Sequence, residues 1–459
     1  MKSKSRTRTI ILLLFEGLLI YLCGVLALLI RYGADGMGVL REGGWHKLLL
    51  SNVIVQAAFY LFDLYDLKMI RLRSVLTLRI MQSLGLSAVL LAILFYAAPG
   101  MMLGRGVFAL AFLLMLTAMI LWRCAAIWLL RNPRLAERII ILGTESTAID
   151  IAREVLQREE QGYEIVGFVG DDASLIGKSL INPRVVGVME NLEQVVRDHR
   201  ADRIVVAMTD RRGKLPLDLL LKLKVRDQVA VEEWSRFFER LTGKISTERL
   251  HPGQLVFSEQ SRWIGLYRRA RRLIDITGAI LGLIGSLPIM ILTAIAIKLE
   301  STGPVFYRQT RVGLHAETFE IIKFRSMRTD AEADGPAWAQ PRDSRVTRVG
   351  RLIRNLRIDE IPQFLNVLRG EMSLIGPRPE RPAFVSQLEE LIPFYSERHL
   401  VKPGLTGWAQ VRYPYGASVD DARGKHQYDL YYIKNQSPPL DALIFLETIR
   451  IVLFGRLSR

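Results

Sequence analysis

The sequence predicts an α-helical membrane protein in three parts: four transmembrane helices, a soluble α/β domain, and a mostly α-helical C-terminal domain that starts with a further apolar helix. Half of the 459 residues are hydrophobic, and four apolar stretches occupy the first 130 residues. Strand-like apolar runs then alternate with helical patterns, and a fifth apolar stretch precedes an arginine-rich tail. A chain of this length is too long for one ordinary domain.

The four apolar stretches lie near residues 10–30, 48–65, 75–97 and 107–130. Each is about 18 to 24 residues long, enough for a helix to span roughly 30 Å of hydrocarbon. The first lacks the small-residue cleavage site of a signal peptide, so we interpret it as a retained span. Basic residues cluster before the first stretch, between the second and third, and after the fourth: Lys2, Lys4, Arg6, Arg8, Lys68, Arg71, Arg73, Arg131, Arg134 and Arg138. The positive-inside rule therefore predicts that both ends of residues 1–133 face the cytoplasm.

Two charged residues, Glu16 and Arg123, fall inside spans, where we expect them to pair within the bundle or to extend towards the headgroups.

Charge and cysteine content restrict the classes of function. Cys23 and Cys124 lie in apolar runs, which argues against a disulfide framework or a cysteine metal site. The formal net charge is +16, from 62 Lys and Arg against 46 Asp and Glu. Together with the apolar runs, this surplus favours an anionic membrane surface or a phosphate-rich substrate over nucleic acid.

Residues 134–258 carry the pattern of a doubly wound parallel sheet. Strand and helix patterns follow one another at 138–143, 148–157, 165–170 and 203–208. The region resembles a dinucleotide-binding Rossmann domain, but Thr144, Glu145 and Ser146 follow Gly143, and the second glycine of the fingerprint is missing. Without that glycine the backbone cannot approach a pyrophosphate closely. We therefore expect a structural or regulatory domain rather than a nicotinamide-binding one.

The fifth apolar stretch, residues 273–297, is long enough to span a membrane. By itself it favours an ordinary kinked span, which would put the basic tail outside the cell. A re-entrant helix, which enters and leaves on the cytoplasmic face, would keep the tail inside. Pro288 removes a backbone donor and kinks a helix, and the hydroxyl of Ser286 is a candidate partner for the freed carbonyl.

Several dense motifs follow this stretch. Alternation in the run 319–327 places Lys323 and Arg325 on one face of a short strand, where they form either a phosphate clamp or a solvated edge. The other motifs are 303–309, 345–368, 370–382, 402–412 and 428–433.

The run 345–368 contains a candidate catalytic pair. Arginines recur every three residues from 345 to 357, which predicts a basic stripe on a helix that ends at Asp359 and Glu360. Pro362 restricts helix to its first turn there, so we expect the two carboxylates at a helix start, where they are favourable. Prolines on both sides of Arg378 stiffen its loop, and an arginine suits bidentate contact with phosphate.

Residues from about 265 to 459 resemble the catalytic domain of the monotopic phosphoglycosyl transferases, also called bacterial sugar transferases. The whole chain is similar to the large members of that family, the polyprenyl-phosphate hexose-1-phosphate transferases of exopolysaccharide biosynthesis. The resemblance implies a monotopic catalytic domain at 259–459 with a re-entrant helix at 273–297. By position, the family's catalytic dyad falls on Asp359 and Glu360, and its substrate-binding cations fall on Lys323, Arg325, Arg354 and Arg378. The family's Ser-Pro membrane break falls on Leu287-Pro288, with Ser286 one place earlier.

The resemblance also implies a reaction. A hexose 1-phosphate passes from a UDP-sugar to undecaprenyl phosphate through a covalent intermediate on Asp359, with release of UMP. It implies Mg²⁺ as cofactor with Asp359 as its ligand, and a base or positioning role for Glu360. It further implies a homodimer in the bacterial inner membrane, with the catalytic domain on the cytoplasmic face. The sugar stays open, with glucose or galactose suggested by resemblance only.

Two other functions fit parts of the sequence. A membrane-anchored NAD-dependent epimerase or dehydratase is disfavoured by the degraded glycine motif and by the absence of a Tyr-x-x-x-Lys pair in residues 135–255. A non-catalytic membrane regulator of polysaccharide export is the alternative, which an intact Asp359-Glu360 pair in a basic setting argues against. His399 and His426 show no ligand spacing, so we expect ordinary packing or surface histidines.

Overall fold

The computed structural model describes residues 4–62, 64–65, 73–130, 136–158, 162–208, 215–247, 264–329, 331, 345–414, 416 and 418–454. The chain divides into two compact units, Met1–Phe237 and Phe238–Arg459. The two predicted domain boundaries, after residues 133 and 258, lie outside the described residues.

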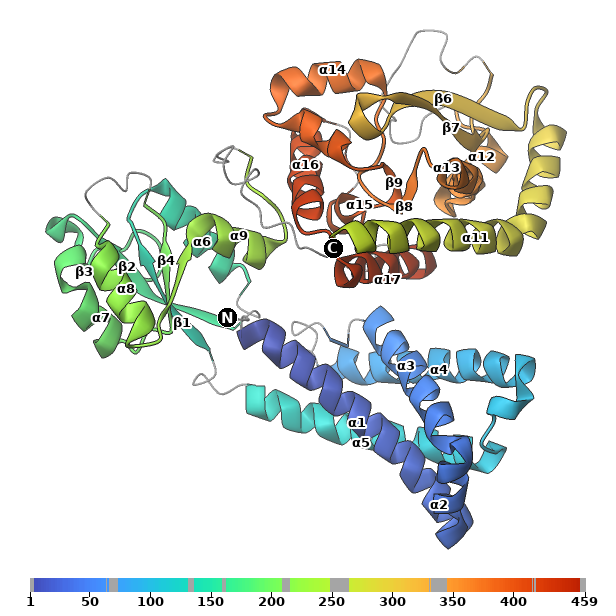
Figure 1. Ribbon diagram of the computed structural model, residues 1–459, viewed down its shortest axis with the longest axis horizontal. Helices are drawn as coiled ribbons and strands as arrows, with labels where there is room; N and C mark the ends of the chain where they lie inside the picture. Colours follow the sequence, from blue (N-terminus) through green and yellow to red (C-terminus); the bar gives the residue numbers. More distant parts are fainter. Residues whose placement is uncertain are drawn as a thin grey trace. The chain divides into compact units, whose positions relative to one another are not determined.

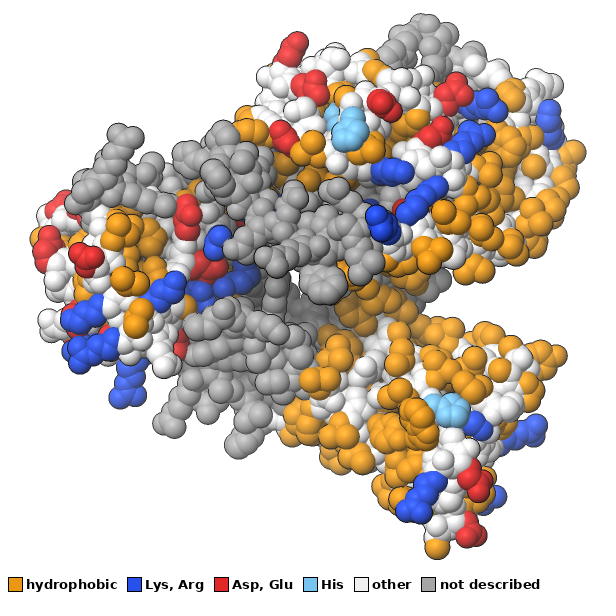
Figure 2. All heavy atoms as spheres, viewed as in Figure 1, with side chains coloured by type: hydrophobic (Ala, Val, Ile, Leu, Met, Phe, Trp, Pro, Cys, Tyr) orange, Lys and Arg blue, Asp and Glu red, His pale blue; other side chains and the backbone are white. Residues whose placement is uncertain are grey.

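Long apolar helices form the first part of the chain: α1 (Lys4–Tyr32), α3 (Trp45–Leu61), α4 (Arg73–Ala97) and α5 (Arg105–Leu130). They coincide with the four predicted spans. The segments Leu13–Leu61, which takes in α1 and α3, Arg79–Ala97 and Arg105–Ala125 are long and apolar enough to cross a membrane. Their buried side chains form one common core, and apolar side chains also cover much of the outer surface of the bundle (Figure 2). Within it the Glu16 carboxylate lies 2.9 Å from the Arg123 guanidinium and accepts a hydrogen bond from Trp122 Nε1 at 3.0 Å, so the predicted pairing is confirmed. The protein is a membrane protein with transmembrane helices.

A five-stranded parallel sheet follows, in the order β3-β2-β1-β4-β5 (Figure 1). Its strands are β1 (Glu137–Leu142), β2 (Tyr163–Gly170), β3 (Val185–Val188), β4 (Arg203–Val206) and β5 (Ala230–Glu233). The connecting helices are α6 (Ser146–Leu156), α7 (Leu192–Asp198) and α8 (Leu217–Val225), and α9 (Trp234–Thr242) follows the last strand. Ile140 and Leu142 of β1 pack with side chains of α7 and α8. The predicted doubly wound α/β sheet is therefore confirmed.

The C-terminal region is mostly helical, as predicted. Its two small sheets pair β6 (Phe306–Val312) with β7 (Thr318–Phe324), antiparallel, and β8 (Ser373–Ile375) with β9 (Gly404–Thr406), parallel. Its helices are α11 (Ile264–Glu300), α12 (Arg348–Asn355), η10 (Ile358–Gln363), α13 (Phe364–Arg369), α14 (Pro382–Leu391), η11 (Tyr395–Leu400), α15 (Trp408–Arg412), α16 (Val419–Lys434) and α17 (Pro438–Phe454). Several small apolar clusters hold these elements together.

The fifth apolar stretch forms the long helix α11, which contains Pro288 and changes direction along its length (Figure 1). The first part of α11 is bound to the rest of the domain, because Arg272 donates to the carbonyls of Val367 and Leu368 at 2.7 and 2.9 Å. Its remaining surface exposes a row of large apolar side chains: Leu273, Ile274, Leu281, Ile284, Leu287, Ile291, Leu292, Ile295 and Leu299. A helix with one bound face and one exposed apolar face suits a position in a membrane.

The structure corrects the expected role of Ser286. Its hydroxyl donates to the carbonyls of Gly282 and Leu283, at 2.6 and 3.4 Å. A helical serine reaches the carbonyls three and four residues before it, whereas the donor that Pro288 lacks would have served Ile284. Ser286 therefore bonds the turn that precedes the break, which bends a helix but does not satisfy the freed carbonyl.

Candidate active site

Asp359 and Glu360 lie in the first turn of η10, between α12 and α13. The carboxylate of Glu300, at the end of α11, accepts hydrogen bonds from the first N–H groups of α12 at 2.6 and 2.9 Å. Arg357 has a φ of 59°, a left-handed conformation that ends α12 and turns the chain into η10.

Asp359 and Glu360 are buried, each 9% exposed. The predicted position at a helix start is confirmed, in a 3-10 helix that leads into α13.

The predicted arginine stripe is only partly correct. Arg348, Arg351 and Arg354 share α12, whereas Arg345 precedes the helix and Arg357 follows it. A three-residue period predicts a continuous helix, but the left-handed residue at 357 interrupts it. Because of this interruption, Arg357 does not continue the row of α12 arginines, and its guanidinium lies near Glu360.

Glu360 is surrounded by cations. Its Oε1 accepts a hydrogen bond from Arg378 Nη2 at 2.7 Å and lies 3.6 Å from Lys323 Nζ and 3.7 Å from Arg357 Nη1. Burial would raise the pKa of Glu360, but the charges of Arg378 and Lys323 outweigh it and hold that pKa well below its ordinary value. Glu360 is therefore ionised at neutral pH and acts as the anionic centre of the cationic cluster.

Asp359 has a different environment. Its Oδ1 is buried and has no hydrogen-bond partner. Burial, and then the negative charge of Glu360, raise the pKa of Asp359, and the nearby cations Lys323, Arg354 and Arg378 oppose this rise only in part. Adjacent carboxyl groups with pKa values shifted in opposite directions are typical of groups with different chemical roles. No protein donor among the described residues engages this carboxylate oxygen of Asp359.

Lys323 on β7 is the cation whose charge responds most readily to its surroundings. Burial lowers the pKa of Lys323 to about 8, although the charge of Glu360 opposes this shift. The ammonium group therefore begins to lose its proton just above neutral pH, and its charge depends on the anions beside it.

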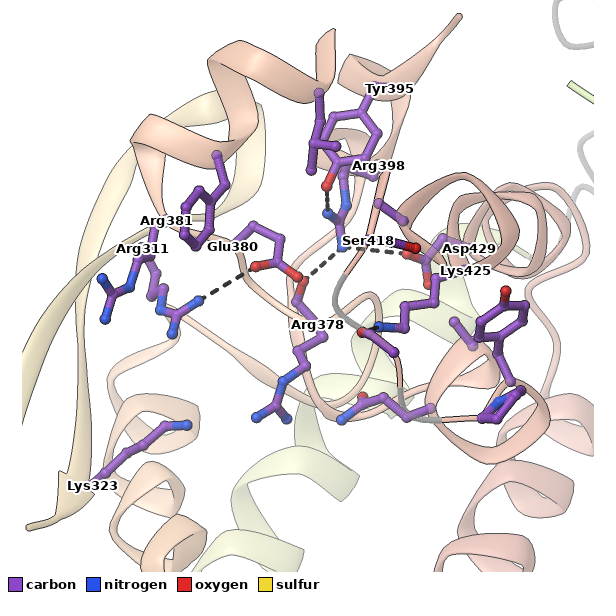
Figure 3. Close-up of a pocket in the computed structure, with 18 of the residues that line it drawn as sticks. Arg311, Lys323, Arg378, Glu380, Arg381, Tyr395, Arg398, Ser418, Lys425 and Asp429 are labelled. Atoms are coloured by element: carbon purple, nitrogen blue, oxygen red, sulfur yellow. Dashed lines mark hydrogen bonds and ion pairs between the residues drawn. The ribbon is translucent and has the colours of Figure 1, made fainter. Parts of the chain in front are cut away.

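A cavity of about 320 Å³ is lined by the three cations that surround Glu360, namely Lys323, Arg357 and Arg378, whereas Asp359 and Glu360 themselves lie behind its lining. Cationic side chains dominate its lining: Arg311, Lys323, Arg345, Arg354, Arg357, Arg378, Arg381, Arg398 and Lys425. The acidic lining residues are Glu380 and Asp429, each next to an arginine: Glu380 lies 3.6 Å from Arg311 and Asp429 lies 3.3 Å from Arg398 (Figure 3). A partly enclosed space with this excess of positive charge suits a ligand that carries several phosphate charges.

The predicted substrate-binding residues do not all meet at the cavity. Lys323, Arg354 and Arg378 line it. Arg325 does not, because its guanidinium donates to the carbonyls of Ser301 and Thr302, at 2.9 and 2.7 Å. Lys323 lies within β7, whereas Arg325 follows its last residue, so the two no longer alternate along one strand. Arg325 therefore stabilises the chain at the end of α11.

Sequence reasoning missed other cavity residues. Arg311 lies two residues after Gln309, the last residue of the motif 303–309, and on the same face of β6, so strand alternation could have found it. Arg398 follows no motif, and only the tertiary structure brings it to the cavity. His399 and His426 are both buried, which agrees with the packing interpretation. Among the described residues, no group of three or more His, Cys, Asp or Glu side chains could hold a metal ion.

Comparison with known proteins identifies the family. The model of the bacterial sugar transferase family matches residues 266–455, and that of a CoA-binding domain matches residues 60–227. The undecaprenyl-phosphate glucose phosphotransferase of Komagataeibacter xylinus is 34% identical over 432 residues, which cover 89% of this chain and 78% of that one. The chain belongs to the bacterial sugar transferase family. The sugar transferase resemblance inferred from the motifs is thereby confirmed.

Other relatives name the same kind of reaction. The UDP-glucose:undecaprenyl-phosphate glucose-1-phosphate transferase of Escherichia coli K12 is 32% identical over 71% of this chain and 70% of its own length. The UDP-N-acetylgalactosamine-undecaprenyl-phosphate N-acetylgalactosaminephosphotransferase of Aeromonas hydrophila is 47% identical over 50% of this chain, and the match covers 58% of that relative. This bacterial sugar transferase is an undecaprenyl-phosphate sugar-1-phosphate transferase, which moves a sugar 1-phosphate from a UDP-sugar to undecaprenyl phosphate.

Proposed function

We propose that the protein transfers a hexose 1-phosphate by two successive displacements and so starts the assembly of an exopolysaccharide. The observation that carries this proposal is the contrast within the dyad. Asp359 has a buried carboxylate oxygen without a partner, and Glu360 beside it is held by cations. A nucleophile needs the first environment and a positioning anion needs the second.

In the first displacement, a carboxylate oxygen of Asp359 attacks the β-phosphorus of the UDP-sugar. The bond between that phosphorus and the bridging oxygen breaks, UMP leaves, and a phosphosugar remains on Asp359. In the second, an oxygen of undecaprenyl phosphate attacks the same phosphorus and releases the Asp359 carboxylate. The product is undecaprenyl diphosphate sugar, and the enzyme regains its starting form.

The cations around the dyad make an attack by one anion on another feasible. Lys323, Arg354 and Arg378 line the cavity at the dyad, where they offset the charge of the diphosphate and of the phosphorane-like transition state. Glu360 holds Arg378 and Lys323 in place through contacts of 2.7 and 3.6 Å. We assign Glu360 a positioning role rather than attack on phosphorus, because its oxygen is already engaged.

Asp359 also suits a ligand of Mg²⁺. Magnesium commonly uses one or two carboxylates and takes its other ligands from substrate phosphates and water, so a three-residue protein cluster is not required. The buried, unpartnered oxygen of Asp359 fits that donor set. When bound, the ion would neutralise diphosphate charge.

The membrane helices give the reaction its location. We propose that α11 is re-entrant and that the catalytic domain faces the cytoplasm of the bacterial inner membrane. The kinked helix with Pro288 and its exposed apolar side chains support this topology. In a variant without Cys23 and Cys124, a cysteine at the exposed position Glu317 should react with a membrane-impermeant maleimide only in inverted vesicles. Labelling in intact spheroplasts would rule out the re-entrant topology.

The reaction is tested with a panel of UDP-sugars. We expect UMP release from at least one of UDP-glucose, UDP-galactose and UDP-N-acetylgalactosamine, with label transferred to undecaprenyl phosphate. Without the acceptor, intact-protein mass spectrometry should detect one phosphosugar on the wild type and none on Asp359→Ala. Full transfer by Asp359→Ala would contradict the nucleophile assignment, and no transfer from any UDP-sugar would contradict the proposed activity. Sedimentation in detergent tests the homodimer that we also propose.

A further inference from the structure

The loop that carries Arg378 is held through its carbonyl groups. Pro377 O accepts from Gly404 N at 2.9 Å, and Glu380 O accepts from Val312 N at 2.9 Å. Between them, Arg378 O accepts from Arg398 Nη2 at 2.7 Å, and Pro379 O accepts from Arg311 Nη1 at 3.0 Å. Four consecutive carbonyls thus each receive a donor, and the donors come from three separate parts of the chain: β6, η11 and β9.

Prolines keep this loop out of regular secondary structure. Pro377 and Pro379 have no N–H, so this loop offers few backbone donors and cannot form a regular ladder. The side chains of Arg398 and Arg311 supply donors to the two central carbonyls instead. In Figure 3, Arg311 lies on one side of Glu380 and Arg398 on the other. The two arginines therefore hold the central part of the loop.

Arg398 is itself fixed by its neighbours. Besides Arg378 O, its guanidinium donates to Asp429 Oδ2 at 3.3 Å and to the hydroxyl of Tyr395, and it lies 4.9 Å from the centre of the Tyr395 ring. The side chain is 7% exposed, and that of Asp429 is 4% exposed. A planar guanidinium with several engaged donors has little freedom, so the carbonyl that it contacts is held in a defined place.

Arg311 plays the corresponding role from β6. Its Nη2 donates to Gln309 Oε1 at 2.6 Å, and its Nη1 lies 3.6 Å from the carboxylate of Glu380. The side chain is 16% exposed. The motifs around Gln309, Gly404 and Asp429 thus converge on the loop of Arg378, although they are far apart in the sequence.

We propose that Arg398 and Arg311 are positioning residues, which hold the Pro377–Glu380 backbone so that Arg378 bonds Glu360 and faces the cavity. The inference rests on the proposed function, because it assumes that Arg378 serves the transferred phosphate. Neither arginine needs to touch the substrate for this role. Their effect on transfer passes through Arg378.

A double-mutant cycle on the full-length protein in detergent tests this. We expect Arg398→Lys to lower kcat/KM for UMP release at least tenfold, because a lysine lacks the second nitrogen and the planar geometry with which Arg398 reaches Arg378 O, Asp429 and Tyr395. Arg378→Lys should have a loss of similar size. When Arg378 is already replaced, adding Arg398→Lys should cost less than threefold, since the residue through which it acts is gone.

Arg325 provides the matched control. It is an equally buried arginine that donates to backbone carbonyls, but at the end of α11. The fold-losses in kcat/KM caused by Arg325→Lys and by Arg378→Lys should multiply in the double variant, because the two residues act independently. Multiplicative losses for Arg398→Lys and Arg378→Lys, or wild-type kcat/KM in Arg398→Lys, would overturn the proposal. If Arg398→Lys does not fold, Arg311→Lys enters the same cycle from the other side of the loop.

The same double-mutant cycle is measured a second time with the affinity for UDP, because UDP binding can be measured without sugar transfer. We expect the same non-additivity there, with weaker binding in each single variant. Coupling in UDP affinity without transfer by the wild type would reject the proposed function and support the positioning roles. Independent effects on UDP affinity, in a wild type that transfers sugar, would reject the positioning roles and leave the proposed function standing.

Discussion

Asp359→Asn and Glu360→Gln should change the stability of the C-terminal domain in opposite directions, although we expect both to abolish or strongly lower transfer. Each change replaces a carboxylate by an amide of nearly the same shape. Asp359 carries a buried oxygen without a partner and a raised pKa, so its ionised form costs stability at neutral pH. Glu360 carries a lowered pKa and three cationic neighbours, so its ionised form contributes stability.

The magnitudes follow from these contacts. Relief of one buried, unpartnered carboxylate should raise the free energy of unfolding by about 1–2 kcal/mol in Asp359→Asn. Loss of the charge-assisted bond to Arg378 is worth about 1.5–3 kcal/mol. Arg378 is 38% exposed and Arg357 54% exposed, so solvent screens both, and we expect a net loss of about 2 kcal/mol in Glu360→Gln. The two variants should therefore differ by about 3–4 kcal/mol.

Hydrogen exchange read by mass spectrometry on peptides from α13 reports the stability of this domain alone. Glu389→Gln on α14 is the control, because Glu389 is exposed and the same chemical change there should stay within about 0.5 kcal/mol. The gain in Asp359→Asn should shrink as the pH falls through the raised pKa of Asp359, and it should be lost below about 4, the ordinary pKa of an aspartate. Shifts of the same sign in both variants would refute the account of the dyad.

Three further outcomes are expected. Burial lowers the pKa of Lys323 to about 8, so transfer should fall as the pH rises through about 8, and Lys323→Arg, which stays charged, should lose this alkaline limb in a rate–pH profile. Burial lowers the pKa of His426 to about 3 in the folded protein, whereas the pKa in the unfolded chain is near 6.5. The contribution of neutral His426 to the free energy of unfolding is therefore complete above about pH 6.5 and decreases as the pH falls towards 3. Urea unfolding should show a loss of about 2 kcal/mol at pH 5, and His426→Phe should not show it. Gly404→Ala would place a Cβ 2.0 Å from Gly376 N, so the loop must move, and we expect transfer to fall at least tenfold with a lowered melting temperature.

The local pattern of the sequence was sufficient for the large elements. Apolar composition over a window of about 20 residues decides whether a helix can span a bilayer, so the four spans could be predicted without tertiary information. The parallel sheet followed from buried strand patterns that alternate with helices. The dyad could be singled out because Asp359 and Glu360 end a run of arginines and precede a proline.

Other features depended on partners that are distant in the sequence. Arg325 looked equivalent to Lys323, yet the strand ends at Phe324, and Arg325 bonds the chain after α11. Likewise, Arg272 directly precedes the apolar stretch 273–297 in the sequence, and only the structure shows that it is bonded to carbonyls of α13. Charge and spacing identify a cation, but they do not determine which anion or carbonyl it reaches.

The sequence by itself therefore determined the class of each domain and the positions of the two candidate catalytic carboxylates. The tertiary structure decided that the two carboxylates differ, although they are adjacent in the chain. Asp359 has a buried oxygen without a hydrogen-bond partner, whereas Glu360 contacts Arg378 and Lys323. The physical reason is that ionisation and reactivity depend on burial and on charges within a few ångströms. Here those charges come from β7 and from the loop after β8, and only folding brings them to η10.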